Sequence, residues 1–406
     1  MQKDQQKLEQ LIKGKKVAFI GAGVSHKTLI KEFVELGAHV TLCDQKKSVE
    51  DFGDYAATIR ELGIDLSLGE NYLDGFKGQD IIMRTPGFVG YFEKPLQDAM
   101  AAGTMVTSEV ELFFDFCPCP IVAVTGSDGK TTTTTLIAKF FEAAGRKVHL
   151  GGNIGAALLP MLPEVSPDDV AVVELSSFQL MTMDRSPHIA VVTNLAPNHL
   201  DVHKDMAEYV AAKENIFRYQ RPGDIAVFNQ DNDITRQQAL RAVGTVRLFS
   251  RRSEPEEGVF LRGEDILCRH NGQEHRIMTT ADIRLPGVHN VENYMAAIAA
   301  VEGLVPDGII RDFARTFNGV EHRIELVRTY HGVRYYNDSI ASSPSRTIAG
   351  LRSFPEQVIL IAGGKDKGIS YDAIGPEINE HVKALILCGA TAGVIRAAVE
   401  KAANFT

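Results

Sequence analysis

We expect an α/β protein of three domains from two observations on the sequence. Short apolar runs rich in β-branched residues alternate with stretches of helical spacing from about residue 16 to residue 402, as in chains that build parallel sheets from βαβ units. Glycine-rich turns follow two of these runs, at 21–23 and 126–129, and each turn leads into a helical stretch. A chain of 406 residues with 44% hydrophobic residues is long enough for about two or three separate cores.

Composition narrows the class of function. The formal net charge of −9 argues against a general nucleic-acid or membrane-surface role, so groups that hold anionic ligands must be placed locally. The five cysteines form no CxxC pair, which suits a reducing compartment. No apolar run is long enough to span a bilayer, and nothing at the start resembles an export signal. We therefore expect a cytoplasmic protein without nucleic-acid or membrane partners.

The first segment, to about residue 110, has the order of elements of a dinucleotide-binding fold. A strand over 16–20, a glycine turn and a helix lead to a second strand that ends in Asp44, which is a Rossmann-like arrangement. His26 stands where the third glycine of the fingerprint belongs, so NAD and other nucleotides both remain open as ligands. A further strand ends in a turn, Arg84 to Gly87, at the edge where such sheets bind ligands.

The central segment is organised around a short phosphate loop. An apolar run ends at Thr125, and Gly126 to Gly129 then lead into a helical stretch that begins with Lys130 and Thr131. Backbone N–H groups and the positive end of the helix favour an anion there, the lysine can reach the outer phosphates, and the threonine hydroxyl can bind Mg²⁺. Two residues separate the glycines where the strict P-loop has four, so a plain strand-to-helix turn is the alternative.

Polar residues follow the other apolar runs of this segment. Asn153, Glu174 and His199 each come just after a run, and the carboxyl ends of parallel strands share one edge of a sheet. We therefore expect the three side chains to lie near Lys130 and to provide part of a Mg²⁺ site. Taken singly, Glu174 could be a charge at a helix start and His199 a turn residue.

Two helices further on carry candidates with ordinary alternatives. Lys213 lies near the middle of a helix expected over 205–219, and by residue type alone it would be a solvated surface lysine. Asn290 and Asn293 lie one turn apart on one face of a helix that follows residue 287, where either could simply cap the helix. Residues 319–323 then provide a linker into a third segment.

The third segment offers few strands. A hairpin-like pair over 324–336 is followed by strand candidates at 358–362 and 384–388, each with a helix after it. This is a thin sheet for an α/β domain. We expect a C-terminal domain that is shortened, because the chain stops early.

The motifs together resemble one family. In order along the chain, eight of them are similar to those of the Mur ligases, the amino-acid-adding enzymes of peptidoglycan synthesis: TGSDGKT, GGNIG, ELSSFQL, NHLD, AAK, HNVEN, EHR and YNDS. The likeness runs from about Lys16 to the last residue. Within the family, LSSFQL and NDSIASSP resemble the members that add D-glutamate, whereas sister ligases for other amino acids and folylpolyglutamate synthase usually differ at both.

This resemblance implies an activity and a domain plan. It implies an acid–D-amino-acid ligase that uses ATP to join D-glutamate to UDP-N-acetylmuramoyl-L-alanine through an acyl phosphate, in the synthesis of cell-wall precursors, with two Mg²⁺ ions and a carbamylated Lys213, and a chain that acts as a monomer. It implies a Rossmann-like UDP-substrate domain over 1–110, a central P-loop ATPase-type domain over 111–318 and an incomplete Rossmann-like domain for the amino acid over 319–406. In this family the lysine at the position of Lys213 is commonly carbamylated by CO₂, which gives a hard cation an oxygen ligand.

The resemblance also assigns roles to single residues. It implies that ATP is bound by Gly126, Ser127, Asp128, Gly129, Lys130, Thr131, Thr132, Asn293, Arg323 and Asp338. It implies that the UDP substrate is bound by Val24, Ser25, Asp44, Gln45, Thr85, Pro86, Gly87, Asn153 and Ser176. It implies Ser342 and Lys367 for D-glutamate, Thr131, Glu174, His199 and Lys213 for metal, and Lys130, Glu174, His199 and Lys213 for catalysis.

Three departures from the family pattern leave alternatives open. Asp128 puts a negative charge in the phosphate loop, Ile340 stands where many relatives have lysine, and the family's closing Ser-Pro-Ala-rich segment is absent after Thr406. Another amino-acid-adding Mur ligase and a non-catalytic UDP-sugar-binding form are therefore the main alternatives. A nicotinamide-dependent dehydrogenase would rest on Gly21, Gly23 and Asp44 and would leave the Lys130 loop unexplained.

Overall fold

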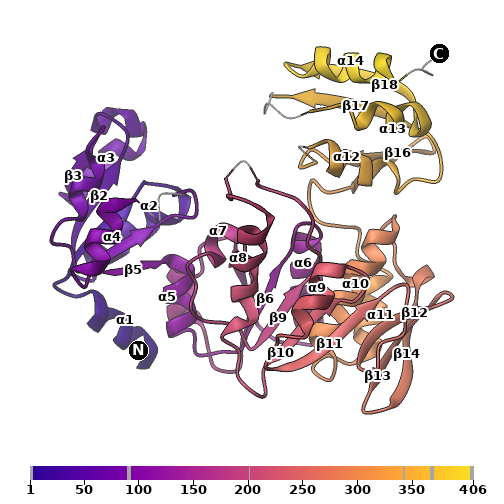
Figure 1. Cartoon of the computed structure of the whole chain (residues 1–406), viewed down its shortest axis with the longest axis horizontal. Coiled ribbons are helices and arrows are strands. Elements are labelled where there is room, and N and C mark those ends of the chain that lie inside the picture. The colour runs from indigo at the N-terminus through magenta and orange to yellow at the C-terminus, as the bar shows by residue number, and fades with distance from the viewer. Residues whose placement is uncertain (1–2, 89–92, 201, 342, 366–369, 403–406) are drawn as a thin grey trace.

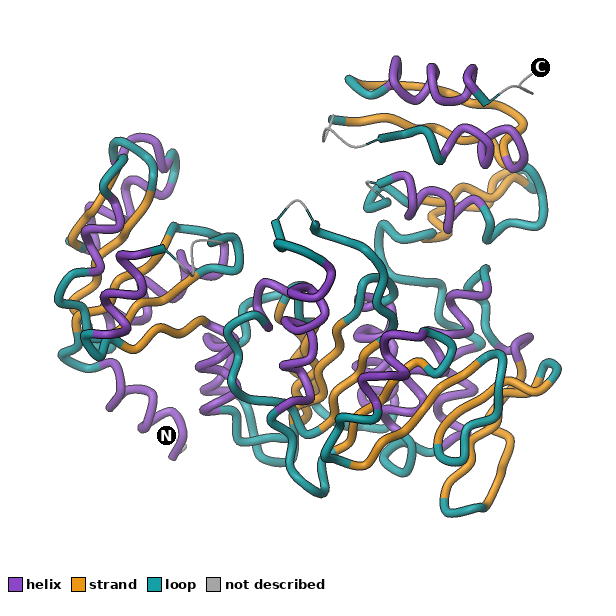
Figure 2. The backbone as a smooth tube through the Cα atoms, viewed as in Figure 1, coloured by secondary structure: helices purple, strands orange, loops and turns teal. Residues whose placement is uncertain are grey.

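The computed structural model describes residues 3–88, 93–200, 202–341, 343–365 and 370–402. Its elements form three groups along the chain: a five-stranded sheet, a nine-stranded sheet and two small two-stranded sheets. Figure 1 shows the five-stranded sheet at the left, the nine-stranded sheet in the centre and the two small sheets above it at the right. Helices and strands alternate through most of the tube in Figure 2. The α/β class expected from the sequence is confirmed.

The first group is a parallel sheet in the order β3-β2-β1-β4-β5. Its strands are β1 (Lys16–Ile20), β2 (His39–Asp44), β3 (Asp65–Leu68), β4 (Ile81–Arg84) and β5 (Met105–Ser108). The accompanying helices are α1 (Lys3–Ile12), α2 (Val24–Glu35), α3 (Tyr55–Leu62) and α4 (Lys94–Ala101), with 3₁₀ turns η1 (Val49–Phe52) and η2 (Tyr72–Phe76). The strand order reverses between β1 and β4, which places the crevice of the sheet at their carboxyl ends.

The second group is a mixed sheet in the order β14-β13-β12-β11-β10-β9-β6-β8-β7. The strands from β7 to β12 in this order run parallel and are β6 (Ile121–Thr125), β7 (Val148–Gly152), β8 (Val170–Glu174), β9 (Ile189–Val192), β10 (Ile225–Asn229), β11 (Thr245–Ser250) and β12 (Gly258–Arg262). An antiparallel edge follows, made by β13 (Asp265–His270) and β14 (Gln273–Thr279).

Helices join and cover this sheet. They are α5 (Glu109–Phe116), α6 (Lys130–Ala143), α7 (Ser177–Leu180), α8 (Met206–Arg218), α9 (Asp233–Ala239), α10 (Val288–Val301) and α11 (Asp307–Ala314), with 3₁₀ turns η4 (Leu159–Glu164) and η5 (Thr280–Asp282). Strand β6 is buried along its whole length, because its two faces enter two different cores. Val122 and Val124 pack with α6 and α10, and Ile121 and Ala123 pack on the opposite side with residues of α8. The phosphate-loop strand is thus held from both faces.

The third group contains an antiparallel hairpin and a parallel strand pair. The hairpin joins β15 (Glu325–Tyr330) to β16 (Val333–Asn337), and the parallel pair is β17 (Val358–Gly364) with β18 (Val382–Gly389). Helices α12 (Pro344–Leu351), α13 (Ile374–His381) and α14 (Ala392–Lys401) form a small core with one face of the strand pair. Its other face exposes Ile359, Ile361 and Ile386. The hairpin and the two later strands were expected from the sequence.

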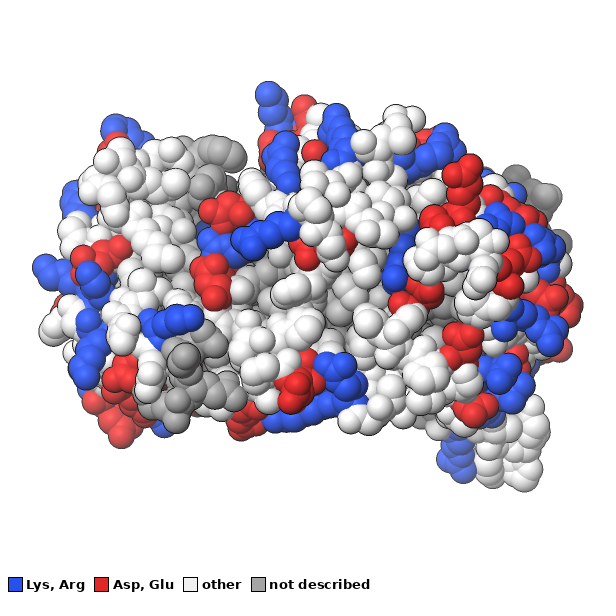
Figure 3. Space-filling view, turned by 90° about the horizontal axis from the view of Figure 1, so that it is seen from below, with Lys and Arg blue, Asp and Glu red and all other residues white. Residues whose placement is uncertain are grey.

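Two general properties bear on partners. In the part of the chain that the structure describes, no helix is both long and apolar enough to cross a bilayer. On the face drawn in Figure 3, basic and acidic side chains are interspersed. The domain boundaries at residues 110 and 318 remain our proposal. Residue 318 lies between α11 and the third group, whereas residue 110 lies at the start of α5.

Candidate active site

The phosphate loop has the backbone conformation that its glycines allow. Gly129 precedes α6 with a φ of +78°, in the left-handed region. Gly126 has a φ of +150°, and a Cβ there would lie 1.9 Å from the hydroxyl oxygen of Thr193. Each glycine thus meets a need for backbone freedom or close packing. The strand, loop and helix expected around residues 121–143 are confirmed.

The segment after β9 fixes this loop from outside. The Ser127 amide donates to the Asn194 carbonyl at 2.8 Å, and the Asp128 amide donates to the Asn194 side-chain oxygen at 3.0 Å. The Thr193 hydroxyl donates to the Asp128 carbonyl at 2.6 Å. The Ser127 hydroxyl lies 3.0 Å from the hydroxyl of Tyr209 on α8. The two amides are therefore engaged, which leaves the first amides of α6 as anion donors.

Lys130 lies at the start of α6 and points back over the loop. Its ammonium donates to the carbonyls of Gly126 and Ser127 at 3.0 and 2.9 Å. Burial lowers the pKa of Lys130, and the nearby charges of Glu174 and Asp128 partly oppose this shift. A cation beside the positive end of a helix is poised for a phosphate.

Glu174 ends β8 next to this loop. It is 1% exposed, and its Oε1 accepts a hydrogen bond from the Asn153 side chain at 2.8 Å. Within the described chain its Oε2 is buried without a hydrogen-bond partner. The pairing with Asn153 agrees with the expected convergence, because β7 and β8 are parallel neighbours. An orphaned buried carboxylate oxygen is suited to a cation ligand.

Lys213 is buried on α8, with 2% of its surface exposed. Its ammonium donates to the Thr125 hydroxyl at 3.0 Å and lies 5.0 Å from the centre of the Tyr209 ring. Burial, reinforced by the charge of Lys130, lowers the pKa of Lys213 well below its usual value. The expectation of a surface lysine from residue type is therefore wrong. Its helical spacing with Tyr209, Ile216 and Phe217, which are all buried, is the sequence signal that could have shown it.

His199 lies in the loop after β9 with a φ of +56°. Its ring meets that of Phe178 edge to face, with 5.3 Å between centroids. Among the described residues, no group of three or more His, Cys, Asp or Glu side chains is arranged to hold a metal ion. A metal here would need oxygen donors of other kinds, such as the Thr131 hydroxyl. The metal role of His199 therefore stays a prediction.

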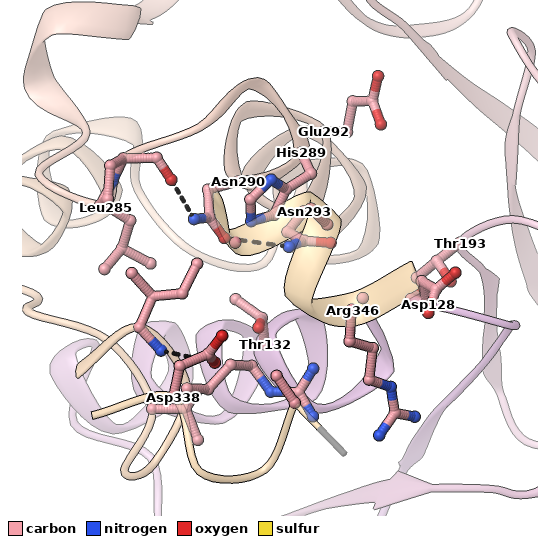
Figure 4. Close-up of a pocket in the computed structure, with 18 of the residues that line it drawn as sticks. Asp128, Thr132, Thr193, Leu285, His289, Asn290, Glu292, Asn293, Asp338 and Arg346 are labelled. Atoms are coloured by element: carbon pink, nitrogen blue, oxygen red, sulfur yellow. Dashed lines mark hydrogen bonds between the residues drawn. The ribbon is translucent and has the colours of Figure 1, made fainter. Parts of the chain in front are cut away.

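A cavity of about 300 Å³ opens beside the loop, between α6, α10 and the third group of elements. Figure 4 shows Asp128, Thr132, Asn293, Asp338 and Arg346 around it. Its wall includes six of the residues expected to bind ATP, together with Asn290: Asp128, Gly129, Thr132, Asn293, Arg323 and Asp338. The Asn293 side chain accepts from the Thr133 hydroxyl at 3.4 Å and donates to Asn290 at 3.2 Å. The pair thus turns into the cavity wall and does not simply cap the helix.

Arg323 and Asp338 bring the third group to this cavity. The Arg323 guanidinium donates to the Thr131 hydroxyl at 3.3 Å, across the linker between the second and third groups. Asp338 accepts from the Ile324 amide at 3.2 Å, and burial raises its pKa. Burial together with Arg346 lowers the pKa of Arg323. Arg323 therefore reaches the start of α6, and both residues line the cavity; their roles in ATP binding stay a prediction.

The residues expected to bind the UDP group gather at the carboxyl edge of the five-stranded sheet. They follow β1, β2 and β4, which are neighbours: Val24, Ser25, Asp44, Gln45, Thr85, Pro86 and Gly87. A Cβ on Gly21 would lie 3.8 Å from the Asp44 carboxylate, so this acid stands beside the glycine turn. Ser176, by contrast, caps α7, with its hydroxyl shared with Gln179.

Arg84 links the five-stranded sheet to helices α5 and α7 of the second group, a contact that was not expected from the sequence. It ends β4 and is 3% exposed. Its guanidinium donates to the carbonyls of Phe178 and Gln179 at 3.3 and 3.2 Å, bonds to the Thr182 hydroxyl and lies 3.8 Å from the Glu111 carboxylate. The sequence signal was weak: a charged residue directly after an apolar run. Ser342 and Lys367, expected to bind D-glutamate, lie outside the described residues.

Comparisons with known proteins agree with this geometry. Residues 124–301 match the model of the Mur ligase middle domain. The chain is 55% identical to a UDP-N-acetylmuramoylalanine–D-glutamate ligase of Acetivibrio thermocellus over 94% of this chain and 81% of that protein. It is 48% identical to a ligase of the same name from Clostridium kluyveri, over 97% of this chain and 84% of that protein.

Solved structures show the same fold at lower identity. A UDP-N-acetylmuramate-alanine ligase, MurC, from Thermotoga maritima has a TM-score of 0.60 at 18% identity, over 96% of this chain and 89% of that one. MurF from Acinetobacter baumannii also has a TM-score of 0.60, at 16% identity, over 97% of this chain and 87% of that one. On the identities to the curated relatives above, the chain belongs to the Mur ligase family.

Proposed function

We propose that this ligase joins D-glutamate to UDP-N-acetylmuramoyl-L-alanine and converts ATP to ADP and phosphate. The observation that carries the proposal is the high identity, over nearly the whole chain, to ligases named for this reaction. The fold alone would not select the amino acid, because ligases with other names share it. The phosphate loop and its cavity supply the chemical part of the argument.

ATP would bind with its phosphates at the start of α6. Gly129, Lys130, Thr131 and Thr132 would bind the phosphates, and the proposal is supported by the position of the first amides of α6 beside the Lys130 ammonium. Asn293 would contact the base, and Arg323 and Asp338 would contact the phosphate and ribose side. The cavity beside the loop supports this placement.

The donor set fits Mg²⁺ as a cofactor. Hard cations prefer oxygen ligands, and the site offers the orphaned Oε2 of Glu174, the hydroxyl of Thr131 and, if carbamylated, Lys213. His199 would join Lys213 at a second ion. When bound, Mg²⁺ would neutralise charge on the phosphates and on the acyl phosphate.

Carbamylation would resolve an electrostatic conflict at Lys213. A free ammonium there is buried and close to Lys130, which is unfavourable for two like charges. A carbamate would place an anionic oxygen group beside Lys130 instead. The Thr125 hydroxyl accepts from the ammonium at 3.0 Å and donates to the Leu175 carbonyl at 2.7 Å, so it would have to leave that carbonyl in order to donate to a carbamate.

The proposed reaction has two steps, as the family resemblance implies. The alanyl carboxylate of the acceptor attacks the γ-phosphorus of ATP, ADP leaves, and the amine of D-glutamate then attacks the acyl carbon and releases phosphate. Lys130 would hold the phosphoryl group through both steps with the N–H that its two hydrogen bonds to the loop carbonyls leave over. Asn153 would orient Glu174 through the 2.8 Å hydrogen bond.

Phosphate release from ATP tests the proposal. The protein is given UDP-N-acetylmuramoyl-L-alanine with D-glutamate, L-glutamate, L-lysine, diaminopimelate or L-alanine in separate reactions. We expect turnover with D-glutamate alone. Turnover with a different amino acid would assign the chain to another branch of the family, and binding of the acceptor without turnover would identify a non-catalytic form.

A variant of Lys213 tests the carbamate. We expect Lys213→Ala to abolish ligation and short carboxylates such as acetate to restore part of it, because they replace the missing oxygen ligand. Lys204→Ala is the matched control, since this exposed lysine lies before the same helix and should leave the rate unchanged. An unchanged rate in Lys213→Ala would refute the role.

A further inference from the structure

One positive charge of the cavity has no role in the function proposed above. Among the described residues that follow the linker ending at Arg323, seven line the wall: Ile324, Asp338, Ile340, Ala341, Arg346, Ala349 and Gly350. Arg346 is the cation among these seven. Ile340 lines the same wall with an apolar side chain, 42% exposed. Any positive charge that α12 brings to a ligand in this cavity must therefore come from Arg346.

The helical spacing of α12 directs Arg346 to the cavity. Arg346, Ala349 and Gly350 are three and four residues apart, so they share one face of the helix, and all three line the cavity. Ile348 and Leu351 lie on the other side and pack in the core of the third group. The two small residues leave room beside the guanidinium. In the view of Figure 4, the Arg346 side chain lies on the same side as Asp128, away from Leu285.

Arg346 also has no partner among the residues that the structure describes. Within the described chain, no hydrogen bond or ion pair engages its guanidinium. Arg352, six residues further along, differs, since its guanidinium pairs with Glu377 through a 2.8 Å hydrogen bond. Arg323 in the same cavity donates to Thr131. A guanidinium held at a cavity wall without a partner is suited to a bidentate anion such as phosphate.

The neighbouring charges indicate which end of the nucleotide Arg346 meets. Arg346 is close enough to Lys130 and Arg323 to lower the pKa of both. Three cations around one space repel one another unless an anion lies between them. Asp128 in the same wall adds a negative charge where a phosphate would bind, which a further cation offsets. Lys130 belongs to the phosphate loop, so the shared space is at the phosphate end of the cavity.

We propose that Arg346 binds the outer phosphates of ATP, as a second arginine that the third group of elements brings to the phosphate loop beside Arg323. The inference rests on the proposed use of ATP. Arg346 would thereby couple the position of α12 to the presence of the β- and γ-phosphates, because a shorter nucleotide would not reach it.

Nucleotide binding tests this role directly. Dissociation constants of the whole protein for AMP-PNP, ADP and AMP are measured by calorimetry, with AMP as a competitor where binding is weak. We expect Arg346→Gln to weaken AMP-PNP binding about tenfold or more, the usual effect of losing a charged hydrogen bond, and to leave AMP binding unchanged. Arg346→Lys should recover part of the loss, because it keeps the charge. Arg352→Gln, at the residue that directly follows the same helix, should bind as the wild type does.

Three results would overturn the proposal. Equal affinity of the wild type and Arg346→Gln for AMP-PNP would remove Arg346 from the nucleotide site. An equal loss for AMP would place it at the ribose or base. A raised KM for D-glutamate with unchanged nucleotide binding would assign it to the amino acid. If the wild type itself fails to bind AMP-PNP, the proposed use of ATP fails, and this inference fails with it.

Discussion

Gly129→Ala is the sharpest probe of the nucleotide site, because the chain provides its own control. Gly129 begins α6 with a φ of +78°, and Gly145 follows the same helix with a φ of +81°. An alanine at either position incurs the same backbone strain, about 1–2 kcal/mol for an L-residue in the left-handed region. The two positions differ in what a Cβ meets. At Gly145 nothing lies within 4 Å, whereas at Gly129 the Asn293 side-chain oxygen lies 2.3 Å away.

The additional cost at Gly129 can be worked from the contacts of Asn293. To give way, this buried side chain must leave its hydrogen bonds to Thr133 and Asn290. Each such bond contributes about 0.5–1.5 kcal/mol, so the displacement costs roughly 1–3 kcal/mol. Because Asn293 lines the nucleotide cavity, we expect that cost to appear in ATP binding. At 1.4 kcal/mol per tenfold, the affinity should fall about 5- to 150-fold.

The assay compares KM for ATP in phosphate release and thermal unfolding midpoints for wild type, Gly129→Ala and Gly145→Ala. We expect both variants to lose similar stability from strain, with a further loss for Gly129→Ala, and the rise in KM to be confined to Gly129→Ala. In an Asn293→Ala background, the stability cost of Gly129→Ala should fall to that of Gly145→Ala. Equal KM values for the two single variants would refute the reasoning, since the clash with Asn293 would then not reach the nucleotide.

Two further predictions concern the first group of elements. Arg84→Met should lower the free energy of unfolding, measured with denaturant, by about 3–5 kcal/mol, because it leaves the buried Glu111 carboxylate without its charge partner. The control Arg60→Met breaks an exposed pair with Glu50 and should change the free energy of unfolding little. An equally small effect of Arg84→Met would contradict the linkage. His26 donates from Nδ1 to the Ile20 and Gly21 carbonyls, and its burial lowers its pKa below 6.5. Because the unfolded chain then binds the proton at a higher pH than the folded protein does, the free energy of unfolding should decrease as pH falls below about 6.5 toward the lower folded pKa. A pH profile of stability identical to that of His26→Asn would refute this prediction.

The convergence of Asn153 and Glu174 could be predicted from the sequence because it depends on local signals. Each ends an apolar run, and parallel neighbours carry such ends to one edge. The phosphate loop was predictable for the same reason, since its glycines, Lys130 and Thr131 are consecutive in the chain. These features need no knowledge of which strand pairs with which.

Features that depend on the order of strands were not predictable. β9 lies beside β6, which brings Asn194 against the loop, and no local pattern specifies that pairing. The link from Arg84 to the carbonyls of α7 joins residues 94 and 95 positions apart. Burial of Lys213 could be predicted in part, because its helical spacing with apolar neighbours is visible in the sequence. The residue type, however, favoured a surface position. Its partner Thr125 is 88 positions away.

The hydrogen bonds of the loop decide how a nucleotide is held. Short phosphate loops are usually pictured with every amide turned to the phosphate, yet the amides of Ser127 and Asp128 already donate to Asn194. Opening them would cost the hydrogen bonds that shape the loop. On the proposed use of ATP, the anion would therefore be bound chiefly by the first amides of α6, by Lys130, and by side chains that arrive from elsewhere. Because Asp128 contributes a negative charge to the same wall, Arg323 of the linker and Arg346 of α12 would offset it, which would tie nucleotide binding to the position of the third group.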